Sequence, residues 1–283
     1  MDFKSIDWNE MWKSETAGNH LQQSSRKELW DKRAYKFNRK VSKFVTAKNR
    51  DKEDYISKVL ARIEIEPGWT VLDIGSGPGS LAIPLAKKAG NVAALDISSE
   101  MLKYLKINAA SAGVKNIKLI NSSWEDAAGK RVEPHDVVVA SRSLTPVDIK
   151  QTLSGLDSAA RRAVYITFPI IHLPFDWEAY RAIGRDGNTK RSPYVYVYNT
   201  LYQMGITANI EILYSRVRTR FESVEDAMED IQWRTDPFVP EEKIKLKEFL
   251  EKKFTAQKGK NALIHEGRSV WALIWWKKEN PSY

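Results

Sequence analysis

The chain has 283 residues, of which 42% are hydrophobic and 29% charged, a composition typical of a globular protein and not of a disordered or fibrous one. It contains no cysteine, which excludes disulfides, thiolate metal sites and a cysteine nucleophile, and we expect no metal. No apolar run approaches the roughly 18 residues that a membrane span needs, and the N-terminus lacks the pattern of a secretory signal. We therefore expect a cytoplasmic protein with no membrane partner.

The net charge of +9 is concentrated in one segment of the chain. Residues 21–50 contain ten Lys or Arg residues against Glu28 and Asp31, a local net charge of +8. Any electrostatic function is therefore expected to be local to this segment.

Two helices are predicted before the first strand. Between residues 29 and 48, apolar side chains recur every three or four positions and form one stripe, with Lys and Arg over most of the remaining surface. A second helix is predicted over residues 52–63, ending before Pro67. We expect residues 1–50 to form an N-terminal helical arm and residues 51–283 the main domain.

Strands and helices alternate over the next hundred residues. Strands are predicted at 69–74, 91–97, 117–121, 135–140 and 163–168, and helices at 78–89, 99–111 and 147–160. The segment HDVVVA at 135–140 is apolar enough to be buried on both faces of a sheet. This order predicts an α/β fold with a doubly wound, mostly parallel sheet.

The alternation ends after Phe168. Residues 169–209 are rich in aromatic side chains and are predicted to be an insertion, with Tyr194, Tyr196 and Tyr198 on one face of an extended segment. A strand at 211–221, helices at 224–233 and 241–254, and a strand at 270–276 behind a turn at 265–267 complete a predicted seven-stranded sheet.

The stretch VLDIGSGPGS, residues 71–80, predicts a ligand-binding turn between a strand and a helix. Its glycines let the backbone approach a ligand closely, but their spacing is not that of the dinucleotide fingerprint. Asp73 lies directly before the first glycine and disfavours a pyrophosphate, whereas it suits a ligand with an ammonium or sulfonium group. Asp96 ends the next predicted strand, where a carboxylate can accept both hydroxyls of a ribose. S-adenosylmethionine (SAM) fits both acids; a dinucleotide or a turn without a ligand are the alternatives.

Over residues 54–168 the chain resembles the class I SAM-dependent methyltransferases. The resemblance rests on VLDIGSGPGS, AALDIS at 93–98, NIKLINSSWED at 116–126 and HDVVVASRSL at 135–144. Outside this span, LWDKRAYKFN at 29–38 is similar to an arm that many small-molecule methyltransferases fold over the cofactor. Where the family usually has an adenine-contacting aspartate, this chain has Ser123.

The resemblance implies a cofactor site made of several short segments. The methionine part would lie over the glycine loop, the ribose on Asp96, and the adenine against Ile97 and along the turn after the third strand. The implied cofactor-binding residues are Asp73, Gly75, Gly77, Gly79, Asp96, Ile97, Ser123, Trp124, Glu125, Ser141 and Trp30.

Methyl transfer from a sulfonium is an in-line displacement, so catalysis depends mainly on positioning and needs no prominent catalytic motif. Arg142 follows the fourth strand and could hold an acceptor carboxylate or phosphate, or close a surface ion pair. His172 could be a general base, or a packed or solvated loop histidine. The resemblance implies that the insertion at 169–209 caps the acceptor pocket, as in many small-molecule members of the family. Its aromatic residues suit a flat or cationic acceptor, or form the core of the cap itself.

The basic segment 21–50 admits three interpretations: a lid with Trp30, Ala34 and Phe37 facing the cofactor, a solvated helix face, or an RNA-docking surface. We predict a SAM-dependent methyltransferase acting on a small-molecule acceptor that is aromatic or anionic. The alternatives are an RNA methyltransferase that docks through residues 21–50, and a SAM-binding protein without catalytic activity.

Overall fold

The computed structural model describes residues 6–16, 23–46, 54–130, 132–171, 174–185, 194–234, 238–256 and 262–278. The chain divides into two compact units. The first comprises Met1–Pro169, Pro193–Leu213 and Ala272–Tyr283, and the second Ile170–Ser192 and Tyr214–Trp271. None of the helices among these described residues is long and apolar enough to cross a membrane.

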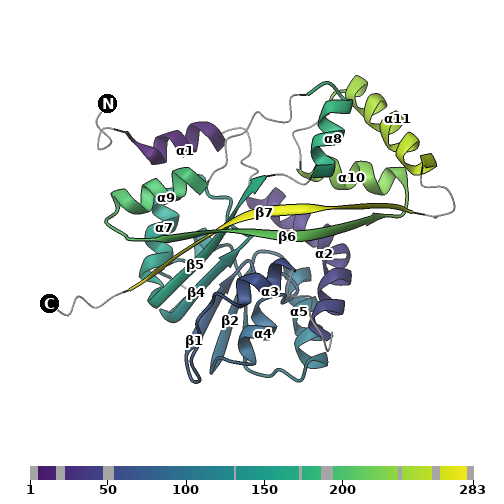
Figure 1. Cartoon of the computed structure of the whole chain (residues 1–283). Helices are drawn as coiled ribbons and strands as arrows, with labels where there is room; N and C mark the ends of the chain where they lie inside the picture. The colour runs from purple at the N-terminus through teal and green to yellow at the C-terminus, as the bar shows by residue number, and fades with distance from the viewer. Residues whose placement is uncertain are drawn as a thin grey trace. The chain divides into compact units, whose positions relative to one another are not determined.

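One seven-stranded sheet has the order β3-β2-β1-β4-β5-β7-β6. The pairs β3–β2, β2–β1, β1–β4 and β4–β5 are parallel, whereas β6 and β7 run in opposite directions (Figure 1). The predicted doubly wound, mostly parallel sheet is therefore confirmed. The strands are β1 Thr70–Ile74, β2 Asn91–Asp96, β3 Ile117–Asn121, β4 His135–Ser141, β5 Ala160–Ile171, β6 Asn209–Phe221 and β7 Leu263–Lys277.

Capping side chains begin most of the helices that follow the strands of the first unit. Ser98, Ser123 and Asp148 each accept a hydrogen bond from a backbone N–H in the first turn of the helix that they precede, and Asp54 caps the helix before β1 in the same way. These caps place helix N-termini at the carboxyl ends of the strands, where open α/β sheets bind ligands. The helices of this unit are α1 Trp8–Thr16, α2 Gln23–Thr46, α3 Tyr55–Leu60, α4 Ala82–Ala86, α5 Ser99–Ser111, α6 Trp124–Ala127, α7 Ile149–Ser158 and α9 Tyr194–Gln203.

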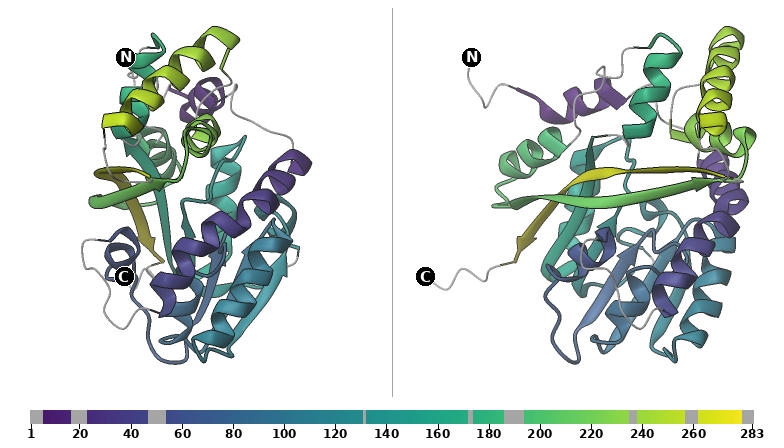
Figure 2. Two further views of the ribbon diagram at one scale, coloured as in Figure 1. Left: turned by 90° about the vertical axis from the view of Figure 1, so that its right-hand side faces the viewer. Right: turned by 45° about the vertical axis from the view of Figure 1, so that its right-hand side comes forward.

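The two N-terminal helices pack on different parts of the first unit. Helix α2 lies along α5 (Figure 2), and the Asn108 side-chain amide donates to Asn38 Oδ1 at 2.8 Å between them. Helix α1 packs on α7 and α9. Its Trp12 is buried, meets the Phe168 ring edge-on at 5.9 Å and donates from Nε1 to the Pro146 carbonyl at 2.9 Å.

The second unit has its own apolar core. It contains α8 Pro174–Ala182, α10 Val224–Arg234 and α11 Pro240–Ala256, together with the adjoining parts of β6 and β7. Ile231, Leu246 and Leu250 are among the residues that pack together there. Arg185 binds both carboxylate oxygens of Glu242, at 2.6 and 2.7 Å, within the same unit.

Several predicted elements differ from the structure. Residues 194–203 are helical, so the tyrosines at 194, 196 and 198 are not on one face of a strand. The buried positions Tyr196, Val197, Thr200 and Leu201 recur at the helical spacing, and this packing overrides the short alternation of Tyr and Val. β7 runs straight through the turn predicted at 265–267, and α1, α6 and α8 were not predicted. The two compact units also divide the predicted insertion 169–209 between them.

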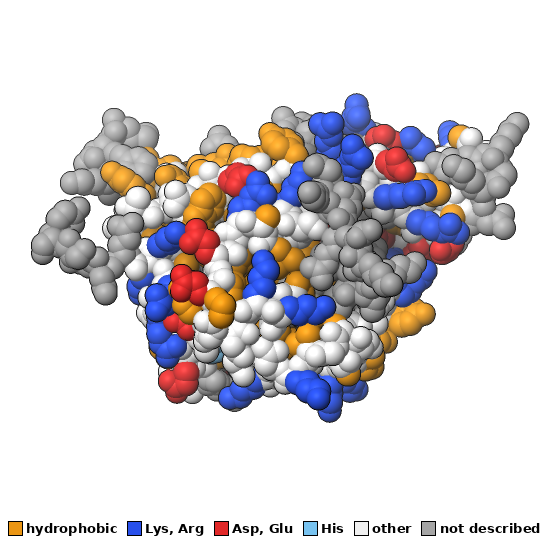
Figure 3. Space-filling view, turned by 60° about the horizontal axis from the view of Figure 1, so that its bottom comes forward, with side chains coloured by type: hydrophobic (Ala, Val, Ile, Leu, Met, Phe, Trp, Pro, Cys, Tyr) orange, Lys and Arg blue, Asp and Glu red, His pale blue; other side chains and the backbone are white. Residues whose placement is uncertain are grey.

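Charged side chains on one face of the molecule are mixed. In Figure 3, Lys and Arg side chains lie dispersed among apolar and acidic ones, not in one continuous band.

Candidate active site

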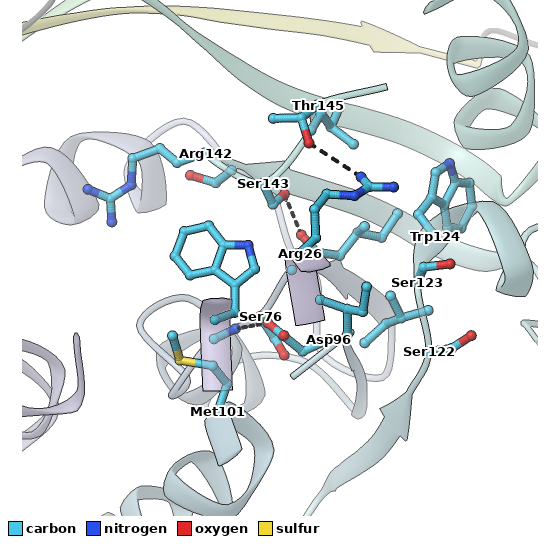
Figure 4. Close-up of a pocket in the computed structure, with 18 of the residues that line it drawn as sticks. Arg26, Ser76, Asp96, Met101, Ser122, Ser123, Trp124, Arg142, Ser143 and Thr145 are labelled. Atoms are coloured by element: carbon cyan, nitrogen blue, oxygen red, sulfur yellow. Dashed lines mark hydrogen bonds between the residues drawn. The ribbon is translucent and has the colours of Figure 1, made fainter. Parts of the chain in front are cut away.

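A cavity opens at the carboxyl ends of β1, β2 and β4 within the first unit (Figure 4). It is lined by α2, the glycine loop after β1, the end of β2, the turn after β3 and the loop after β4, with Met101 of α5 and Thr152 of α7. Among the sequence-predicted residues, those that line the cavity are Gly75, Gly77, Asp96, Ile97, Ser123, Trp124, Glu125, Ser141, Arg142 and Trp30. Asp73 and Gly79 lie behind this lining, and His172 lies outside the described residues.

The glycine loop requires its glycines for two different reasons. Gly75, Gly77 and Gly79 all have positive φ, at 68°, 53° and 97°, a conformation that other residues adopt at a cost. A Cβ on Gly79 would lie 2.7 Å from Ile83 Cδ1, so this glycine allows helix packing under the loop. Nothing lies within 4 Å of the position of a Cβ on Gly77, which leaves open space beside the loop for a ligand.

Two carboxylates lie beneath the glycine loop. Asp73 is fully buried, and its Oδ2 has no hydrogen-bond partner. Burial, together with the negative charge of Asp96, raises the pKa of Asp73 to about 7. Burial also raises the pKa of Asp96 to about 6, although the backbone N–H groups of Ser98 and Gly77 donate to it, each at 2.8 Å.

Asp96 keeps acceptor capacity for a ligand. Each of its oxygens accepts one backbone hydrogen bond, Oδ1 from Ser98 and Oδ2 from Gly77, and each has a second lone pair. A pair of adjacent hydroxyl groups matches this arrangement, one on each oxygen. The carboxylate is thus held in place by the chain before any ligand arrives.

The turn after β3 lines one side of the cavity, with Ser122, Ser123 and Trp124 in a row (Figure 4). Ser123 caps α6, since its Oγ accepts from the backbone N–H of Asp126 at 3.1 Å. Trp124 is buried beside Gly155, where an added Cβ would lie 3.3 Å from the indole. Ser122 Oγ is buried with no hydrogen-bond partner, so it is the polar group on this side that a ligand would satisfy.

Helix α2 supplies both apolar and charged groups to the lining. Trp30, Phe37 and Val41 line the cavity, and the Trp30 and Phe37 rings meet edge-on at 5.4 Å. Arg26 extends across the cavity (Figure 4), and its Nη1 is 3.5 Å from both Glu125 Oε1 and Thr145 Oγ1. These are long contacts for a guanidinium, so Arg26 is held loosely between the turn after β3 and the loop after β4.

Arg142 has an unusual conformation at the end of β4. Its φ of 58° is in the left-handed region, which for a residue other than glycine costs energy and often marks a functional site. Its guanidinium lies over the Tyr55 ring, 4.3 Å from the centroid, and points away from Ser122, Ser123 and Trp124 (Figure 4). Burial raises the pKa of Tyr55, whose hydroxyl hydrogen-bonds Ser141 Oγ at 2.8 Å and Thr167 Oγ1 at 2.7 Å.

The lining fits SAM by its chemistry. Ser76 Oγ and Ser122 Oγ are buried polar atoms without partners on residues that line the cavity, an arrangement that a polar ligand would complete. The paired acids favour a ligand with cationic groups over a phosphate. Within the described residues, no cluster of three or more His, Asp or Glu side chains could hold a metal ion.

Sequence reasoning missed several residues of the site. Arg26, Ser76, Ser122 and Ser143 line the cavity, and none of them was predicted to bind a ligand. Ser76 lies inside the quoted glycine motif, so its position was a usable signal. Ser122 and Ser143 lie inside the quoted motifs at 116–126 and 135–144, whereas for Arg26 the chain offers no local signal, because its contacts join segments that are far apart in sequence.

The chain is similar to known methyltransferase sequences. A family described as a methyltransferase domain matches residues 65–169. An uncharacterized protein of Haemophilus influenzae is 32% identical over 248 residues, which cover 87% of this chain and 88% of that protein. A ubiquinone biosynthesis O-methyltransferase of Vibrio campbellii is 35% identical over 92 residues, 32% of this chain and 39% of that enzyme.

Solved structures show the same fold. A candidate methyltransferase from Bacillus halodurans aligns with 80% of this chain and 99% of its own, at 15% identity and a TM-score of 0.53. The YcgJ protein from Bacillus subtilis aligns with 80% of this chain and 98% of its own, at 14% identity and a TM-score of 0.51.

Proposed function

Because the chain belongs to the class I SAM-dependent methyltransferases, we propose that it transfers the methyl group of SAM to a small-molecule acceptor. The bound cofactor supplies a methyl group activated by a sulfonium. The protein's part is to hold the acceptor in line with that methyl group and to exclude water from it.

The observation that carries this proposal is that α2 lines the cavity with apolar side chains. Its apolar residues Trp30, Phe37 and Val41 line the cavity, while the helix packs along α5. This supports the lid interpretation of the basic segment, because the apolar stripe is used to cover a pocket. A covered pocket favours an acceptor that can be enclosed.

We assign the cofactor to the acidic part of the cavity. Asp96 would accept the two ribose hydroxyls, and Gly77 would leave room for the adjoining part of the cofactor. Ile97 and the turn Ser122–Glu125 would lie along the adenine. Asp73 would add negative charge near the loop, which favours a cationic ligand, and it is held by the backbone N–H of Ala82 at the start of α4.

We assign the acceptor to the loop after β4, where Arg142 would bind an anionic group. The described residues place no carboxylate in an ion pair with Arg142, and the Tyr55 ring fixes the direction of its guanidinium. No general base is required if the acceptor atom is already nucleophilic. The similarity to the ubiquinone biosynthesis enzyme covers only 32% of this chain, so it supports the transfer chemistry and not a quinone acceptor.

RNA is the second candidate acceptor, favoured by the ten Lys or Arg residues within 21–50. RNA binding through this segment would weaken steeply with salt, because each phosphate contact releases counterions. Small-molecule transfer predicts no such dependence.

Transfer from methyl-labelled SAM tests the proposal. The purified protein is incubated with labelled SAM and, separately, with the small-molecule, RNA and protein fractions of a cell extract, with Asp96→Ala as the matched inactive control. Label in the small-molecule fraction, absent with the control, supports the proposal. Label in RNA that is lost on ribonuclease treatment would assign the second acceptor, and SAM binding without label anywhere would indicate a binding protein.

A further inference from the structure

Asp31, on helix α2, lies against the N-terminus of α5. Its Oδ1 accepts a hydrogen bond from Ser98 Oγ at 2.6 Å and one from the backbone N–H of Glu100 at 3.2 Å. Its Oδ2 pairs with Lys27 at 2.7 Å. A carboxylate at this position complements the positive end of the α5 dipole, so Asp31 fastens α2 to the first turn of α5.

Ser98, which donates a hydrogen bond to Asp31, also donates one to the cofactor-site carboxylate of Asp96. Ser98 is fully buried, and its backbone N–H donates to Asp96 Oδ1 at 2.8 Å. Its Oγ accepts from the backbone N–H of Met101 at 3.1 Å while it donates to Asp31. Asp31, Ser98 and Asp96 therefore form a continuous chain of hydrogen bonds from the arm to the floor of the cavity.

This chain links the position of α2 to the geometry of Asp96. The Ser98 hydroxyl donates its hydrogen bond to Asp31 Oδ1, so it has this acceptor only when Asp31 is in place. Without that acceptor a buried hydroxyl loses a charge-assisted hydrogen bond, and the turn that orients the Ser98 N–H toward Asp96 is less well fixed.

The charge of Asp31 also acts on Asp96. Asp96 is flanked by Asp73 on β1 and, through Ser98, by Asp31 on α2, whose charge Lys27 partly neutralises. The negative charge of Asp31 contributes to the raised pKa of Asp96.

We propose that Asp31 is a positioning residue for the cofactor site, which holds Ser98 and thereby fixes the carboxylate of Asp96 when α2 is docked on α5. This inference rests on the proposed function, since it assigns Asp31 to the same SAM site. It makes the arm part of the binding site through a polar connection, in addition to its apolar lining.

Titration calorimetry with S-adenosylhomocysteine on the full chain tests this role, with wild type, Asp31→Ala, Asp31→Asn and Asn38→Ala compared at several pH values. Asn38→Ala is the matched control, because it removes another polar contact between α2 and α5 that does not involve Ser98. Thermal unfolding of each variant checks that it is folded.

We expect Asp31→Ala to bind about tenfold more weakly than wild type, and Asn38→Ala to bind like wild type. Asp31→Asn keeps an acceptor for Ser98 and removes the charge, so at high pH it should bind nearly as well as wild type. Loss of the Asp31 charge lowers the pKa of Asp96 in this variant. Asp96 therefore stays ionised to lower pH, and binding should persist to lower pH than in wild type. Because removal of the charge alone accounts for this pH shift, the hydrogen bond to Ser98 is tested by the affinity of Asp31→Ala relative to Asp31→Asn at high pH.

Two results would overturn the inference while leaving the proposed function intact. One is equal affinity of Asp31→Ala and wild type; the other is equal weakening by Asp31→Ala and Asn38→Ala, which would mean that only docking of α2 matters. Absence of binding by the wild type would overturn the proposed function, and this inference with it.

Discussion

Gly75 and Ser143 lie so close together that a Cβ on the glycine would be 2.2 Å from the serine Cβ. Ser143 Oγ donates to the Ile74 carbonyl at 2.6 Å, so the loops after β1 and β4 are joined directly beside the cavity. This contact brings the segment assigned to the cofactor next to the segment assigned to the acceptor. Methyl transfer requires the two to be adjacent.

Gly75→Ala is expected to destabilise the protein by about 2 to 4 kcal/mol, because it adds overpacking to a strained backbone. It should also abolish SAM binding by separating the two loops. Gly68→Ala is the matched control, because Gly68 has a φ of 89° but nothing within 4 Å of an added Cβ. Urea unfolding of both variants measures the difference; equal costs would show that the contact with Ser143 is unimportant.

Asp73 predicts a particular dependence of stability on pH. Its pKa rises from 3.8 in the unfolded chain to about 7 in the ligand-free fold, so the folded state holds the proton more tightly. The associated stability is fully present below pH 3.8 and is lost as the pH rises to about 7. Asp73→Asn should therefore gain stability relative to wild type between those limits, by roughly 4 kcal/mol at most.

Asp136→Asn is the control of opposite sign. The pKa of Asp136 is lowered although burial opposes this, because Thr70 and Arg162 donate hydrogen bonds to it. This variant should lose stability relative to wild type as the pH rises through the acid range to the ordinary value of 3.8, and should keep that deficit at higher pH. Urea unfolding at a series of pH values measures both, and parallel curves for Asp73→Asn and wild type would contradict the raised pKa.

Arg142→Gln is expected to lower methyl transfer to the acceptor by at least about tenfold while leaving the affinity for SAM unchanged. The physical reason is that the guanidinium lies over Tyr55, away from the adenine side of the cavity. Arg142→Lys, which keeps the charge but not the fork of donors, should be intermediate. The effect is measured by steady-state kinetics with methyl-labelled SAM and the extract fraction that accepts the label. Weaker SAM binding would place Arg142 in the cofactor site instead.

Trp12 is expected to stabilise the loop that carries Arg142, because its indole donates to Pro146 in that loop. Trp12→Phe should cost about 1 kcal/mol for the lost hydrogen bond, and Trp12→Ala about 3 kcal/mol. Met11→Ala, at an exposed neighbouring position, should change the stability by less than about 0.5 kcal/mol. Thermal unfolding checks these values, and no loss in Trp12→Ala would mean that α1 is not docked in solution.

The sequence was most informative where local chemistry decides the structure. The glycine loop could be predicted because positive φ and close approach require glycine, and Asp96 because an acid at the end of the second strand has a limited set of roles. The parallel sheet followed from the order of apolar strands and helices. These features depend on residues that are near one another in the chain.

Sequence reasoning failed where distant segments meet or where two periodicities compete. Arg26 reaches Thr145 across 119 positions, and Asp31 reaches Ser98 across 67, so neither partner has a local pattern that reveals the other. At Tyr194–Tyr198 a short alternation suggested a strand, whereas burial of Val197 and Leu201 selects a helix. The predicted turn at 265–267 was wrong because β7 continues as one strand through these residues.

Calorimetric titration of SAM into wild type and Asp96→Ala tests the central claim most directly. The account predicts that wild type binds SAM and that Asp96→Ala, with an unchanged unfolding transition, binds at least about tenfold more weakly, because both ribose hydroxyls lose their acceptor. Equal affinity of the two proteins would contradict the assignment of this cavity as the SAM site.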